Sequence, residues 1–63
     1  MTQKELLYYE DAIGHEKSIV SICQDMSSKL EDESLKSFID NEITLHESMQ
    51  NELMNMLEEK ANE

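Results

Sequence analysis

Three side chains that can bind metals or transfer protons stand where a helical repeat would normally place apolar residues. Glu16 falls between Ile13 and Val20 in one apolar repeat, and Glu42 and His46 fall within a second. Carboxylate oxygens combined with imidazole nitrogens suit iron or manganese. Two copies of the chain would supply four carboxylates and two imidazoles, which is the ligand set of ferritin-like di-iron and di-manganese proteins. One hypothesis is therefore a di-metal site built from Glu16, Glu42 and His46, with iron or manganese as the cofactor.

The spacing of these residues also supports structural alternatives. The di-metal motif has Glu and His three residues apart, whereas Glu42 and His46 are four apart. If the chain reverses near residue 32, Glu42 lies level with Ile22, about 9 Å along the helix from Glu16. Glu16 and His46 would then form a half-buried contact that fixes the register of two helices, or would reach water at the edge of the apolar stripe.

No other arrangement in the sequence indicates catalysis. Cys23 is the only cysteine and has no histidine placed to activate it, and glycine-rich phosphate loops are absent. His15 lies beside the apolar stripe, and we expect no role for it. The pattern predicts a non-enzymatic protein without a cofactor, with the di-metal protein as the alternative.

Composition limits the class of partner. Fifteen acidic residues and five lysines give a net charge of −10, which disfavours binding to nucleic acid and to anionic membrane surfaces. No apolar run approaches the roughly 20 residues that cross a bilayer, and the N-terminal residues lack the features of a signal peptide. A single cysteine fits a reducing compartment, so we expect a cytoplasmic protein.

The apolar repeat predicts two helices rather than one. Thr2 and Glu5 match a capping box, which predicts a first helix over about residues 3–30. Continuing its stripe beyond Leu30 meets only polar residues, and a new stripe begins one residue out of phase at Leu35. We therefore predict a turn over about 31–33, with Asp32 as the N-cap of a second helix that runs to about residue 59.

Two helices joined by so short a turn must form an antiparallel hairpin, an all-α fold. A hairpin of this size leaves much of its apolar surface in water, so we expect two copies to pair into a four-helix bundle. Docking onto a larger protein assembly is an open alternative. The residues expected in the dimer core are Leu6, Tyr9, Ile13, Val20, Cys23, Leu35, Phe38, Leu45, Met49, Leu53 and Met56.

Part of the sequence resembles a known family. The run of residues 10–17, EDAIGHEK, followed by LKSF at 35–38 and ITLH at 43–46, resembles the helical hairpin of the spore coat protein F family. The resemblance covers residues 6–57. It implies a ferritin-type helical bundle with a coat or storage role in a spore or forespore, and it assigns no catalytic residues.

Overall fold

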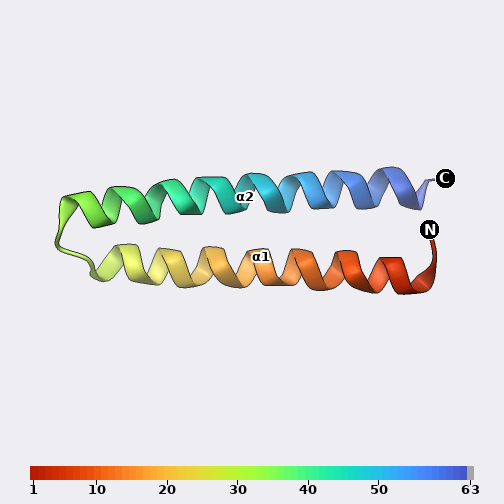
Figure 1. Cartoon of the computed structure of the whole chain (residues 1–63), viewed down its shortest axis with the longest axis horizontal. Coiled ribbons are helices and arrows are strands. Elements are labelled where there is room, and N and C mark those ends of the chain that lie inside the picture. The colour runs from red at the N-terminus through yellow and green to blue at the C-terminus, as the bar shows by residue number, and fades with distance from the viewer. Residues whose placement is uncertain (63) are drawn as a thin grey trace.

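The fold consists of two long helices packed side by side and pointing in opposite directions (Figure 1). The computed structural model describes residues 1–62. Helix α1 comprises Gln3–Lys29 and helix α2 comprises Glu33–Ala61. Together they form a rod of 47 × 15 × 10 Å with the start of α1 and the end of α2 at the same end. The predicted all-α helical hairpin is confirmed.

Helix α1 begins with the predicted capping box. The Thr2 hydroxyl accepts a hydrogen bond from the Glu5 backbone N–H (3.0 Å), and the Glu5 carboxylate accepts one from the Thr2 N–H (2.9 Å). These two bonds satisfy backbone donors that a helix start otherwise leaves without partners. The helix ends at Lys29, one residue earlier than predicted, where the Lys29 amine pairs with Asp25 at 2.9 Å.

The turn between the helices uses extended backbone and no glycine. Leu30 and Asp32 both adopt extended conformations, and no residue of the described chain has a positive φ. The Asp32 carboxylate accepts a hydrogen bond from the Leu35 N–H at 3.0 Å, so Asp32 is the N-cap of α2 as predicted. Helix α2 continues to Ala61, two residues further than predicted, because its last turn contains good helix formers and a favourably placed Lys60.

The two helices meet along a seam, which we define as the buried and half-buried residues that recur at alternating three- and four-residue steps. Apolar residues dominate the α1 side, whereas the α2 side includes a lysine, a histidine and a glutamine. The seam comprises Leu6, Tyr9, Ile13, Glu16, Val20, Cys23 and Ser27 of α1, the C-cap residue Leu30, and Lys36, Ile39, Ile43, His46, Gln50, Leu53 and Leu57 of α2.

The hairpin has a very small core. Ile13 and Val20 are each 9% exposed and Ser27 is 7% exposed, and no large side chain of residues 1–62 is fully buried. Neither described helix is long and apolar enough to cross a membrane. The fold is therefore held by one narrow seam that leaves most side chains on the surface.

Candidate functional site

Glu16, His46 and Glu42 form a connected polar group in the middle of the seam. The Nδ1 atom of His46 lies 2.5 Å from a carboxylate oxygen of Glu16, across the two helices. The Nε2 atom of the same ring lies 3.6 Å from Glu42, one turn earlier on α2. The side chains of Glu16 and His46 are only 13% and 20% exposed, so the contact is largely shielded from water.

The two carboxylates contact opposite edges of the imidazole. A neutral imidazole donates from only one nitrogen, and because an ionised carboxylate can only accept, a hydrogen bond to ionised Glu16 requires the hydrogen on Nδ1. Protonation of the ring adds Nε2–H as a second donor, which faces Glu42. The geometry thus gives a half-buried contact between α1 and α2, one of the structural alternatives raised by the sequence.

This arrangement does not fit a metal within one hairpin. A metal needs ligand atoms that converge on one point, but Glu16 and Glu42 lie on different sides of the His46 ring. Within residues 1–62, no three His, Cys, Asp or Glu side chains are grouped so that they could hold an ion. Within one hairpin the residues predicted as ligands are therefore neighbours in space, and the predicted di-metal site, which needs two copies of the chain, stays a prediction.

The same group also lacks the partner that general-base catalysis requires. In a catalytic dyad, the imidazole nitrogen opposite the carboxylate accepts a proton from a nucleophile. Here that nitrogen, Nε2 of His46, faces the Glu42 carboxylate instead. The contact joins α1 to α2.

A second polar cluster lies nearer the turn, and sequence analysis missed it. The buried Ser27 hydroxyl donates to the Asp40 carboxylate at 2.5 Å. The Lys36 amine donates to the Ser27 carbonyl at 3.0 Å and lies 3.3 Å from its hydroxyl. Ser27 itself is the signal that could have revealed this cluster, because it is a polar residue on the apolar repeat. Once the chain reverses, Ser27 and Lys36 lie at the same height along the two helices.

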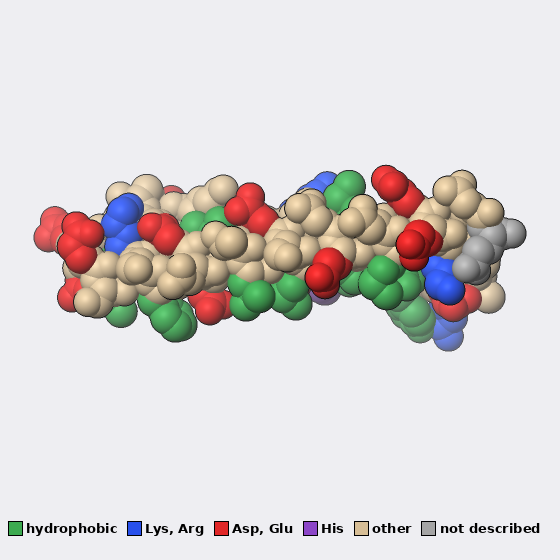
Figure 2. All heavy atoms as spheres, turned by 90° about the horizontal axis from the view of Figure 1, so that it is seen from above, with side chains coloured by type: hydrophobic (Ala, Val, Ile, Leu, Met, Phe, Trp, Pro, Cys, Tyr) green, Lys and Arg blue, Asp and Glu red, His purple; other side chains and the backbone are tan. Residues whose placement is uncertain are grey.

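A broad apolar surface runs along one side of both helices. Its residues immediately precede seam residues, and on antiparallel helices this offset turns both rows to the same side. We define the apolar face as Tyr8, Ala12, Ile19, Ile22 and Met26 of α1 and Leu35, Phe38, Leu45, Met49 and Met56 of α2. In Figure 2 hydrophobic side chains gather along the lower edge of the rod.

Large side chains of this face are strongly exposed. Tyr8 and Phe38 are each 60% exposed, Ile22 is 59% and Leu45 is 52% exposed. A shallow groove of about 310 Å³ between the helices, lined by Tyr8, Tyr9, Ala12, Leu53 and Met56, shows that residues of α1 and α2 share the surface. Single exposed apolar residues are ordinary, whereas a large patch of them is typical of interaction sites.

The predicted dimer-core residues divide between the seam and the apolar face. Those that lie in the seam, where they contact the other helix of the same hairpin, are Leu6, Tyr9, Ile13, Val20, Cys23 and Leu53. Those that lie on the apolar face are Leu35, Phe38, Leu45, Met49 and Met56.

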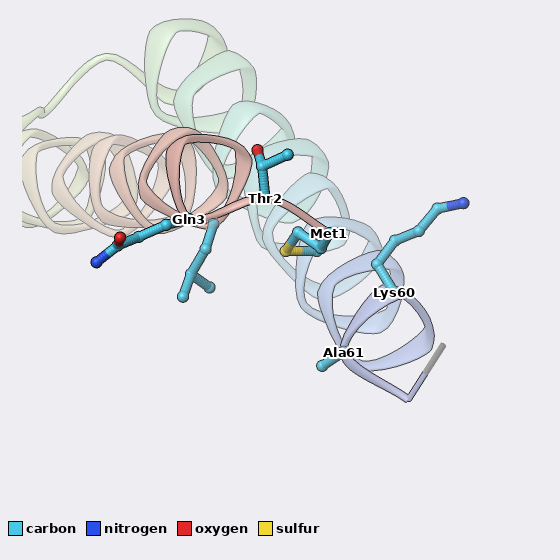
Figure 3. A pocket seen from close by; sticks show the side chains of 6 residues that line it. Met1, Thr2, Gln3, Lys60 and Ala61 are labelled. Carbon is cyan, nitrogen blue, oxygen red and sulfur yellow. The ribbon is translucent and has the colours of Figure 1, made fainter.

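A further hollow lies at the open end of the hairpin. It measures about 410 Å³, and Met1, Thr2 and Gln3 from the start of the chain line it together with Lys60 and Ala61 from the last turn of α2 (Figure 3). Its lining contains no carboxylate, imidazole or thiol side chain.

Comparison with known proteins gave no match: no family model, no curated protein and no solved structure is similar to this chain. The resemblance to the spore coat protein F family stays a prediction from the sequence.

Proposed function

We propose that this protein is a non-enzymatic self-association module whose hairpin binds a second copy through the apolar face, giving a four-helix bundle. The observation that carries the proposal is the row of exposed apolar side chains along both helices. In water this surface is unfavourable, and a second identical face covers it completely because a two-fold interface uses the same patch on both partners.

The exposed area supports association. The chain exposes 4874 Å². A compact protein of 7.4 kDa is expected to expose about 4,200 Å². The excess of about 670 Å² is close to the roughly 800 Å² that each partner buries in a standard protein interface. One interface of this size would thus reduce the exposed area of each chain to about that of a compact monomer of the same mass.

Charge disfavours two classes of occupant for the apolar face. Helix α2 carries seven carboxylates and two lysines, and the whole chain has a net charge of −10. Anionic lipids and nucleic acid would be repelled by this charge. A second copy is repelled as well, but on this face most residues are uncharged and apolar, so the burial of apolar area opposes the repulsion.

A role within a larger protein assembly is consistent with this property. The resemblance to spore coat protein F implies such a role, and dimers that bury their apolar faces would be its building units. This part of the proposal depends on the sequence resemblance alone.

The test compares substitutions on the two broad sides of α2. Phe38→Glu with Leu45→Glu places two carboxylates on the apolar face, and Ser37→Glu with Asn51→Glu places two on the opposite, polar side. Light scattering at tens of micromolar protein should show a dimer for the wild type and the polar-side control, and a monomer for the apolar-face variant. Circular dichroism of each variant checks that helices remain.

Two results would overturn the proposal. One is a wild-type chain that stays monomeric and helical at that concentration. The other is an apolar-face variant that dimerises as strongly as its control.

A further inference from the structure

The proposed dimer can form in two ways. Two hairpins stacked face to face can place their turns at the same end, so that each α1 covers the partner's α2. Alternatively, the turns lie at opposite ends, so that α1 covers α1 and α2 covers α2. Both arrangements obey two-fold symmetry, so the choice depends on which side chains each brings together.

Contacts across the seam fix the height of each residue along the rod. Ser27 contacts Lys36, and Glu16 contacts His46, so residues at equal height have numbers that add up to about 63. On the apolar face, Met26 is therefore level with Phe38 and Ile19 with Leu45. Tyr8 and Met56, which line one groove, agree with this register.

The opposite-end arrangement brings like charges together at the interface. Helix α2 spans Glu33–Ala61, so its midpoint is near Glu47. In this arrangement α2 lies antiparallel to the partner's α2. When the two midpoints are aligned, Glu42 faces the partner's Glu52. Both glutamates belong to the same rows of α2 as the apolar-face residues, and symmetry creates this repulsion twice. Like charges juxtaposed across an interface disfavour that partner orientation.

The helices as wholes show the same preference. Helix α1 carries five carboxylates and three lysines, a net charge of −2, whereas α2 carries seven carboxylates and two lysines, a net charge of −5. The opposite-end arrangement would pack the strongly acidic α2 against the partner's α2. The same-end arrangement packs each α2 against the less acidic α1 of the partner, which lowers the total repulsion.

We infer that two copies pack with their turns at the same end, each α1 lying on the partner's α2. This inference rests on the proposed self-association. Ile19 then faces the partner's Leu45, and Met26 faces the partner's Phe38. Glu52 faces the partner's Ala12, one turn from the partner's His15.

Two carboxylates at the open end of the hairpin oppose the same-end arrangement. In this arrangement Glu5 is level with the partner's Glu59, which is unfavourable. Lys4 adjoins Glu5 and is nearly level with the same carboxylate, so its positive charge offsets part of this repulsion. The contact also lies at the edge of the interface, where water screens it.

The experiment measures the distance between the two turns. A nitroxide label is attached to Glu31→Cys in a Cys23→Ser background, because Glu31 is exposed in the turn and Cys23 is the only natural cysteine. Pulsed electron paramagnetic resonance should give a distance of about 30 Å or less, a few interhelical spacings of about 10 Å. A distance near or above the 47 Å length of the rod would overturn the orientation.

Light scattering on the same labelled sample separates the two proposals. A dimer with a long distance overturns only the orientation, whereas a monomer overturns the self-association and the orientation together. Unlabelled Cys23→Ser, checked for helix content and dimerisation, controls for the background substitution.

A charge reversal gives an independent readout. Glu52→Lys would tighten an opposite-end dimer, because the introduced amine would face the partner's Glu42. In the same-end dimer it faces the partner's Ala12 near His15, so only the smaller net negative charge of each copy should tighten the dimer, by less than tenfold. A dissociation constant that falls tenfold or more would contradict the inference.

Discussion

Glu16 of α1 and His46 of α2 touch across the seam, with 2.5 Å between a carboxylate oxygen and Nδ1, although 30 residues separate them in the chain. The contact fixes the height of one helix against the other, since a shift by one turn would separate the pair by about 5 Å. It also joins two groups that would each be costly to leave half-buried alone.

The first prediction concerns this pair. His46→Ala leaves the Glu16 carboxylate shielded and without its donor, so the free energy of unfolding should fall by about 2 kcal/mol. A double-mutant cycle with Glu16→Ala, measured by urea denaturation at one fixed protein concentration, should give a coupling energy of about 1–3 kcal/mol.

The exposed Asp25–Lys29 pair is the matched control for that cycle. Its side chains are 63% and 73% exposed, and it should couple by only about 0.3–0.5 kcal/mol. Equal coupling energies for the two pairs would show that the seam contact has no special role in stability.

The second prediction concerns Ser27. Ser27→Ala removes the hydroxyl that donates to Asp40 and lies near the Lys36 amine, so the free energy of unfolding should fall by about 1 kcal/mol. Ser28→Ala is the control, because the Ser28 hydroxyl bonds only to the exposed Asp25 carbonyl of its own helix. If Ser27→Ala lowers the melting temperature no more than Ser28→Ala does, the cluster has no stabilising role.

The third prediction concerns Gly14, which lies in the interior of α1. A Cβ added there meets nothing within 4 Å, and the glycine has no positive φ. Gly14→Ala should therefore raise the free energy of unfolding by about 0.5–1 kcal/mol, because alanine loses less backbone entropy in a helix. A lower melting temperature would indicate that another molecule packs closely against this position.

The fourth prediction concerns pH and the capping box. The Thr2 backbone N–H, followed by the Thr2 hydroxyl, holds the pKa of the Glu5 carboxyl below its ordinary value. A carboxyl whose pKa is lowered by folding stabilises the fold at pH values above its unfolded pKa of about 4.3. This contribution disappears as the pH falls through the lower, folded pKa.

The measurement is a series of thermal melts between neutral pH and pH 3. Glu5→Gln should lose stability relative to the wild type at neutral pH, and the difference should shrink as the solution becomes acidic. A difference that stays constant over this range would contradict the role of the ionised carboxylate.

The sequence by itself determined the two helices, their caps and the chain reversal. Thr2 with Glu5 and Asp32 act through hydrogen bonds within three residues, which the order of the residues is sufficient to specify. The sequence also shows the change of phase of the apolar repeat between Leu30 and Leu35. In one unbroken helix, the apolar residues after Leu35 would face a different side from the first stripe.

Only the tertiary structure decided which residues of α2 enter the seam. The α2 sequence has two adjacent rows that could pack against α1, one with Leu35 and Phe38 and one with Lys36 and Ile39, and hydrophobicity favours the first. The structure places the second in the seam, where Lys36 and His46 meet polar partners on α1. Such cross-helix pairs depend on the rotation and height of both helices at once, so the periodicity of either helix alone does not reveal them.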